Sequence, residues 1–155
     1  MSDYILSVIP ADQQWQPSRT AADRLTALAT ELCPRIPNGT DVRVDATWYD
    51  ALTAVDPGEC LESITCPLCT AAIDLQWWAD LLEDNQGPTF TTLATTTPCC
   101  GGATTLDTLH FDEPCGFARF ELAIWNADRE SFTPTELATL AAALGHPVRQ
   151  IRAHI

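Results

Sequence analysis

The stretch Cys66-Pro67-Leu68-Cys69 decides how the middle of this chain folds. Two cysteines separated by a proline and one other residue form a tight turn that points both sulfur atoms toward one spot, as in many zinc sites. A second group, Pro98-Cys99-Cys100-Gly101, follows about thirty residues later. The sequence therefore predicts a structural Zn²⁺ site with four sulfur ligands, Cys66, Cys69, Cys99 and Cys100.

The two cysteine groups can be aligned with each other, residues 66–75 with residues 97–106. Each group follows β-prone residues and continues into a short stretch that alternates apolar and polar residues. On these residues the segment 60–107 resembles a zinc ribbon, in which two such turns on two hairpins bind one metal ion. The resemblance covers under a third of the chain. It implies a structural metal site of four cysteines and, by itself, no catalytic activity.

The second turn departs from the zinc-ribbon pattern because Thr97 stands where the family has its first cysteine. Threonine is a weak zinc ligand, so we expect Cys99 to replace it from inside the turn. Binding through the adjacent residues Cys99 and Cys100 would strain the usual geometry. The alternatives for the fourth ligand are Cys115, Cys60 and His110. The alternative to any metal site is that the cysteines serve as small buried hydrophobic residues.

Length and composition indicate one domain, or one domain that carries a small insert. The chain has 155 residues, of which 46% are hydrophobic, enough for a substantial core.

The chain has no apolar run long enough to span a bilayer, and residues 1–4 lack the basic region of a signal peptide, so we expect a cytoplasmic protein. In that compartment seven cysteines favour metal binding or buried thiols over disulfides. All eight basic residues are arginine, a bias associated with GC-rich bacterial genomes.

The negative charge is concentrated in the segment that carries the cysteines. The formal net charge is −13, and no lysine or arginine occurs between Arg43 and Arg119. Eleven of the 21 acidic residues lie in positions 50–115. This distribution disfavours binding to nucleic acid, which requires a basic surface, and it favours a basic protein partner. The alternative is that the acidic surface only keeps the protein soluble.

The residues on either side of this segment have the order strand, helix, strand in each flank. Alternating or continuous apolar patterns predict strands over residues 4–9, 42–48, 118–124 and 148–155. Helical spacing of apolar residues predicts a helix that begins at Pro17 and a second that follows Thr133. We therefore predict an α+β fold: a ferredoxin-like, split β-α-β scaffold from residues 1–49 and 117–155, with a zinc-ribbon-like insert at 50–116.

The start of the second helix has the clearest local pattern in the chain. In Phe132-Thr133-Pro134-Thr135-Glu136-Leu137, Thr133 is the expected N-cap residue and Pro134 the first helical residue. Glu136 completes a capping box. Gly145 is expected to end the helix.

A short acidic helix is predicted between the two cysteine groups, after Asp74. Two adjacent tryptophans, Trp77 and Trp78, cannot both face the same core. An exposed tryptophan beside acids would suit a protein partner, so the predicted partner-binding residues are Trp77, Asp80, Glu83 and Asp84. The alternative is that both tryptophans are largely buried between insert and scaffold.

The sequence contains none of the common catalytic motifs. It has no Gly-x-Ser-x-Gly, no phosphate-binding loop and no His-Glu-x-x-His, and His110-Phe111-Asp112 does not match the zinc-deaminase pattern. We therefore assign no catalytic residue and expect a non-enzymatic, zinc-stabilised protein-binding module, for example an immunity protein or an inhibitor of a basic partner. The alternative is a small zinc enzyme in which three cysteines and a water bind the metal.

Overall fold

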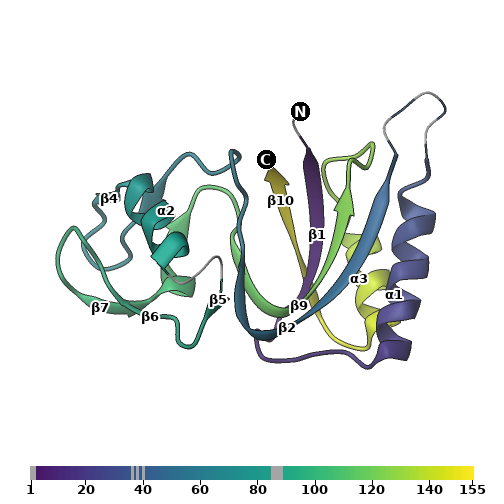
Figure 1. The fold of residues 1–155 in the computed structure, drawn as a ribbon, viewed down its shortest axis with the longest axis horizontal. Coiled ribbons are helices and arrows are strands. Elements are labelled where there is room, and N and C mark those ends of the chain that lie inside the picture. Colours follow the sequence, from purple (N-terminus) through teal and green to yellow (C-terminus); the bar gives the residue numbers. More distant parts are fainter. Residues whose placement is uncertain (1–2, 36, 38, 40, 85–88) are drawn as a thin grey trace.

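The fold is mixed α and β, as the alternating patterns predict. The computed structural model describes residues 3–35, 37, 39, 41–84 and 89–155. These residues form three α-helices and antiparallel sheets (Figure 1). No helix in the described ranges is both long and apolar enough to cross a membrane.

The main sheet has five strands in the order β10-β1-β9-β2-β5, and all neighbouring strands are antiparallel. The four predicted strands are present, with slightly different ends. They are β1 (Tyr4–Pro10), β2 (Arg43–Val55), β9 (Gly116–Trp125) and β10 (Val148–His154), and the short β5 (Thr89–Phe90) joins the edge beside β2. β2 is longer than predicted because it continues past an irregularity between Trp48 and Thr53.

Two helices, α1 (Arg19–Leu32) and α3 (Pro134–Leu144), cover one face of this sheet (Figure 1). Each presents an apolar stripe to alternate residues of β1 and β9, so that both elements bury their hydrophobic side chains. Ser18 is the N-cap of α1, so the prediction that Pro17 is the first helical residue is wrong. The buried core between helices and sheet contains Leu6, Val8, Leu25, Ala29, Phe120, Leu122, Ile124, Leu140 and Leu144.

The predicted caps of α3 are confirmed. The Thr133 hydroxyl accepts from the backbone N–H of Glu136 (3.2 Å), and the Glu136 carboxylate accepts from the N–H of Thr133 (2.8 Å). Gly145 ends the helix in the left-handed conformation, at φ 81°. Glu136 also pairs with Arg129 in the preceding loop. The cap and the ion pair therefore fix where α3 begins.

Residues 56–115, called the cysteine unit below, connect β2 to β9. Apart from β5, which joins the main sheet, the elements described in this unit lie beside that sheet (Figure 1). Two small sheets, β4-β3-β8 and β6-β7, and one helix make up this unit. Its elements are β3 (Ile64–Thr65), β4 (Ala72–Ile73), α2 (Leu75–Asp84), β6 (Ala94–Thr96), β7 (Ala103–Thr105), the 3₁₀ turn η1 (Leu106–Thr108) and β8 (His110–Phe111).

The cysteine unit has its own hydrophobic core, and this core continues into the main sheet. Trp78 of α2 is buried and makes edge contacts with Phe111 of β8 and with Phe117 of β9. Phe117 also contacts Phe90 of β5, whose strand pairs with β2. The unit is therefore joined to the scaffold by shared apolar packing as well as by the two chain connections.

Candidate metal centre

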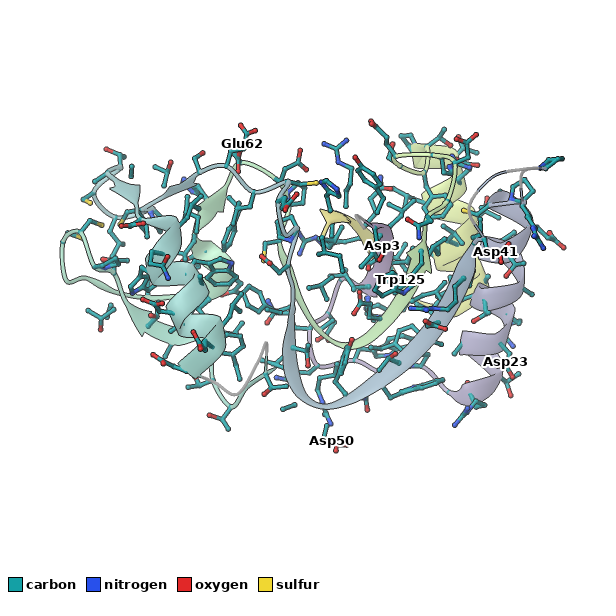
Figure 2. The ribbon with its side chains drawn as sticks, turned by 45° about the horizontal axis from the view of Figure 1, so that its top comes forward. Asp3, Asp23, Asp41, Asp50, Glu62 and Trp125 are labelled. Atoms are coloured by element: carbon teal, nitrogen blue, oxygen red, sulfur yellow. The ribbon has the colours of Figure 1, made fainter. Side chains whose placement is uncertain are left out.

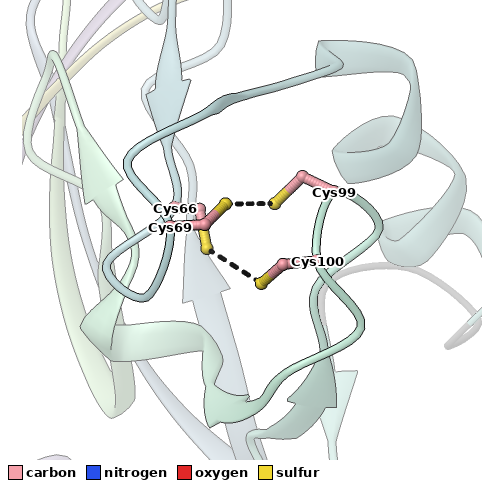
Figure 3. Close-up of side chains that lie close together, drawn as sticks. All are labelled: Cys66, Cys69, Cys99 and Cys100. Carbon is pink, nitrogen blue, oxygen red and sulfur yellow. Dashed lines mark hydrogen bonds between the residues drawn. The ribbon is translucent and has the colours of Figure 1, made fainter.

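Four cysteine sulfurs converge at the end of the cysteine unit. Their Sγ atoms all lie within 4.8 Å of one another (Figure 3). Cys66 and Cys69 lie in the turn between β3 and β4, and the other two lie in the turn between β6 and β7. The closest contacts run between the turns, from Cys69 to Cys99 (3.4 Å) and from Cys66 to Cys100 (3.9 Å). The predicted cysteines are therefore the ones that the fold brings together.

The two turns have the same backbone hydrogen bonds. In each, the N–H of the first residue donates to the carbonyl five residues later, and its own carbonyl accepts from the N–H four residues later. The four bonds are Cys66 N to Ala71 O (2.9 Å), Thr70 N to Cys66 O (3.0 Å), Thr97 N to Gly102 O (3.0 Å) and Gly101 N to Thr97 O (2.9 Å). Each fifth residue is left-handed, Thr70 at φ 64° and Gly101 at φ 70°. These bonds match the sequence alignment of Cys66 with Thr97.

Thr97 is the residue whose part in this site the sequence did not reveal. Its side chain is 1% exposed, and its Oγ1 lies 3.1 Å from the sulfur of Cys100. The same oxygen accepts from the backbone N–H of Gly102 (3.2 Å). With that N–H donating to it, the hydroxyl can donate its own proton to the Cys100 sulfur. Thr97 therefore supports one of the four sulfurs instead of supplying one.

Hydrogen bonds from the turns favour thiolates at two of the cysteines. Burial opposes ionisation of Cys66, but the backbone N–H groups of Cys69 and Leu68 lower the pKa of the Cys66 thiol to about 6. At Cys100 the Thr97 hydroxyl, followed by the N–H of Gly102, lowers the pKa below its ordinary value.

The neighbouring sulfurs have the opposite effect on Cys69. The N–H of Ala71 favours its thiolate, yet hydrogen bonding with Cys99 and the other cysteines raises the pKa of Cys69 to about 12. Four thiolates this close together repel one another unless a cation lies between them. The cluster therefore needs a bound cation before all four sulfurs can ionise.

The sulfur separations fit a tetrahedral metal ion. With metal–sulfur bonds of about 2.3 Å, the sulfurs of a tetrahedral zinc site lie roughly 3.8 Å apart. The Cys69–Cys99 and Cys66–Cys100 separations of 3.4 and 3.9 Å bracket that value. Thiolates are soft ligands that prefer zinc, copper(I) or iron–sulfur centres to magnesium or calcium. Cys66, Cys69, Cys99 and Cys100 would thus hold such an ion with all four positions occupied by protein.

The alternative fourth ligands lie elsewhere in the structure. Cys115 is buried in the core of the cysteine unit, where burial raises the pKa of its thiol. Cys60 lines a separate cavity beside Arg152. His110 is exposed on β8, where it pairs with Thr65 of β3. None of these three belongs to the four-sulfur cluster.

Of the two tryptophans of α2, only Trp78 is fully buried, and none of the predicted partner-binding residues is. Trp78 is 3% exposed, and its ring nitrogen donates to Asp56 (3.1 Å). Trp77 is half-buried against the same core, and the acidic side chains that are exposed are Asp80, Glu83 and Asp84. The helix thus presents acids to solvent, with Trp77 partly exposed on the same helix.

Comparisons with protein-family models, with curated proteins and with solved structures produced no match. Function must therefore be inferred from the site itself.

Proposed function

We propose that this protein is a non-enzymatic binding module in which a structural Zn²⁺ ion holds the cysteine unit in shape for a basic protein partner. The observation that carries the proposal is the convergence of Cys66, Cys69, Cys99 and Cys100. A zinc ion with four protein ligands has no open position for a substrate or a catalytic water. Because the unit is small and its sulfurs repel when ionised, the metal contributes directly to its folding.

Two finer features of the fold belong to this proposal. The scaffold has two strand-helix-strand halves, β1-α1-β2 and β9-α3-β10. We take it to be ferredoxin-like, because in the sheet a strand of one half lies between the two strands of the other half. β9 lies between β1 and β2, and β1 lies between β9 and β10. We take the cysteine unit to be a zinc-ribbon-like insert, because its two matched turns sit on the hairpins β3-β4 and β6-β7.

The charge distribution supports a basic partner. The cysteine unit contains no lysine or arginine, and four zinc-bound thiolates would add roughly two further negative charges. Figure 2 shows Glu62 of this unit, and Asp50 at the bend of β2, pointing away from the ribbon. A one-sided negative field speeds association with a positive surface and discourages acidic competitors. An immunity protein or an inhibitor of a basic toxin or nuclease would use a surface of this kind.

The metal part of the proposal is tested by metal analysis and X-ray absorption on the purified protein. We expect one zinc per chain with four sulfur neighbours. Three sulfurs and one oxygen would overturn the structural role and favour the zinc-enzyme alternative, in which a bound water is the reactive group.

The partner part is tested with the immobilised protein at low and high salt, followed by affinity measurement with each purified captured protein. The double substitution Glu83→Lys/Asp84→Lys should weaken binding strongly at low salt. The matched control is Asp23→Lys/Glu31→Lys, which makes the same change in charge on exposed positions of α1. Equal losses from both pairs, or binding that salt does not affect, would contradict an acidic docking surface on the cysteine unit.

A further inference from the structure

A second candidate site lies on the face of the main sheet that the helices leave uncovered. Strand pairing places Ser7 of β1 opposite Ala123 of β9, and Thr47 of β2 opposite Glu121 of β9. Ala123 and Glu121 are two residues apart on β9, so their side chains point to the same face of the sheet. The side chain of Ser7, which is opposite Ala123, shares this face with Glu121. A cavity of about 200 Å³ opens there; it is lined by Ile5, Ser7, Tyr49, Thr53, Ala54, Val55, Asp56, Glu121, Ala153 and Ile155. None of these residues belongs to the four-sulfur cluster.

The carboxylate of Glu121 is held in one orientation by two hydroxyl groups. Ser7, which is 2% exposed, donates to Oε2 (2.5 Å), and Tyr49 donates to Oε1 (2.7 Å). Burial and the adjacent Glu121 raise the pKa of Tyr49 above its ordinary range, so the phenol keeps its proton and donates. Each oxygen accepts one hydrogen bond and retains a second lone pair. The carboxylate is thus fixed in place with capacity for a further donor.

The cavity has negative groups and no positive one. Its second carboxylate, Asp56, accepts from Trp78 (3.1 Å) and from the backbone N–H of Gly58 (3.2 Å). No lysine, arginine or histidine lines the cavity, and no ion pair among the described residues includes Glu121. Arg119, two residues from Glu121, donates instead to the backbone carbonyl of Asp50 (3.2 Å). A charged group in a partly buried site is stabilised by a partner of opposite sign.

Part of the cavity wall is apolar. Ile5, Val55, Ala153 and Ile155 line the same cavity as the two acidic residues. This combination suits a ligand with a short alkyl chain and a positively charged end that donates hydrogen bonds. The volume is sufficient for a chain of about four carbons that ends in an ammonium group.

We propose that this cavity binds a primary alkylammonium group, with Glu121 as the anionic anchor and with Ser7 and Tyr49 as the residues that orient it. The ammonium group can come from a lysine side chain of a protein or from a free aliphatic amine. The proposal is independent of the metal centre, because it uses only residues outside the cysteine cluster.

The test is an NMR titration of the metal-loaded protein with n-butylammonium, with Nα-acetyl-lysine methylamide and with the uncharged n-butanol. Both ammonium probes should shift the signals of residues 5–7, 49 and 121 and saturate, whereas n-butanol should not. Saturation by only one ammonium probe assigns the source: the lysine derivative indicates a lysine side chain, and n-butylammonium indicates a free amine. Equal binding of n-butanol, or no saturation by either ammonium probe, overturns the proposal.

Two variants separate recognition from a purely structural network. Glu121→Gln removes the charge while keeping the size, and it should weaken ammonium binding at least about tenfold, because the charge-assisted hydrogen bond is lost. Ser7→Ala keeps the charge and loosens its orientation, so binding should weaken less. Both must retain the wild-type amide spectrum outside the cavity. If Glu121→Gln binds n-butylammonium as tightly as wild type, the assignment of Glu121 as anchor is wrong.

Discussion

Thr97 occupies in the second turn the place that Cys66 occupies in the first. Both residues begin their turns with the same pair of backbone hydrogen bonds, and both side chains are buried. Cys99 meanwhile stands at the position of Leu68, inside the turn. The first sulfur of the second turn therefore lies two residues later than Cys66 does in the first turn, and the place equivalent to Cys66 holds a hydroxyl that contacts Cys100.

Thr97→Cys should be tolerated and should place a further sulfur beside the cluster. The new sulfur would take the position equivalent to Cys66 and compete with Cys99 for the metal. X-ray absorption of Thr97→Cys/Cys99→Ser should give four sulfur neighbours, whereas Cys99→Ser alone should give three. Three sulfurs in both variants would mean that the two turns are not equivalent around the metal.

Thr97→Val tests the hydroxyl separately from the shape of the side chain. The change keeps a branched side chain and removes the donor to Cys100, so metal affinity should fall by about tenfold to a hundredfold, as for other groups that support a ligand. Competition with a chromophoric chelator measures this loss. Wild-type affinity in Thr97→Val would show that the Thr97–Cys100 contact has no effect on the metal.

Cys66→Ser should unfold at least the cysteine unit. Loss of one ligand removes several kcal/mol of metal-coupled folding free energy, and Cys66 is also part of the core of this unit. Thermal melts with and without a zinc chelator measure the effect: the chelator should lower the Tm of the wild type and leave the variant unchanged. Cys60→Ser is the matched control, because Cys60 lies outside the cluster. A wild-type melt that the chelator does not alter would contradict metal-coupled folding.

The ion pair at the start of α3 should make stability depend on pH in the acid range. Hydrogen bonds from Arg129, followed by the N–H of Thr133, lower the pKa of Glu136 from 4.5 to about 2. Because the folded-state pKa is the lower one, this stabilisation is complete above about pH 4.5 and is lost as the pH falls toward 2. Glu136→Gln, which can still form the capping box, should lower stability at neutral pH and flatten the profile in that window.

The control for this change is Asp128→Asn, which removes the same charge from an exposed neighbour. Urea titrations at several pH values measure both variants. A Glu136→Gln profile that stays parallel to the wild type between pH 5 and 2 would show that the pair with Arg129 does not produce the acid sensitivity.

Gly116 should be far less tolerant of a side chain than Gly102. A Cβ at Gly116 would lie 2.3 Å from Cδ1 of Ile9 and 3.2 Å from Cδ1 of Ile151, both fully buried, so Gly116→Ala should cost about 1–3 kcal/mol. A Cβ at Gly102 would meet Cδ1 of Leu68 at 2.4 Å, but that side chain is exposed and can move. Comparable unfolding free energies for the two variants would contradict this difference in packing.

Local sequence patterns were sufficient to predict most helices and strands of the scaffold and the four cysteines of the cluster. The capping box at Thr133 and the left-handed Gly145 follow from neighbouring residues, and the spacing of Cys66 and Cys69 defines their turn in the same way. The predicted start of α1 at Pro17 is wrong, because Ser18, the residue after it, is the N-cap of the helix.

Features that depend on distant residues were not predictable in this way. The register shift between Trp48 and Thr53 in the β2–β9 pairing, and the pairing of β5 with the far end of β2, both involve residues that are distant in the sequence. The Glu121 network brings together positions 7, 49 and 121 from three strands, and no local pattern links them. The contact between the Thr97 hydroxyl and the Cys100 sulfur depends on how the turn is folded and not on the residue types alone.

Phe117 and Glu121 lie on the same strand, and this gives the core of the cysteine unit and the sheet cavity a fixed spacing. Phe117 packs in the core of the cysteine unit and Glu121 anchors the sheet cavity, four residues or roughly 13 Å further along β9. A strand inside a sheet is stiff, so a partner docked on the cysteine unit would keep a constant spacing from a ligand in the cavity. A single partner that reached both would bind the second at a high effective concentration, and it would be selected by length as well as by charge.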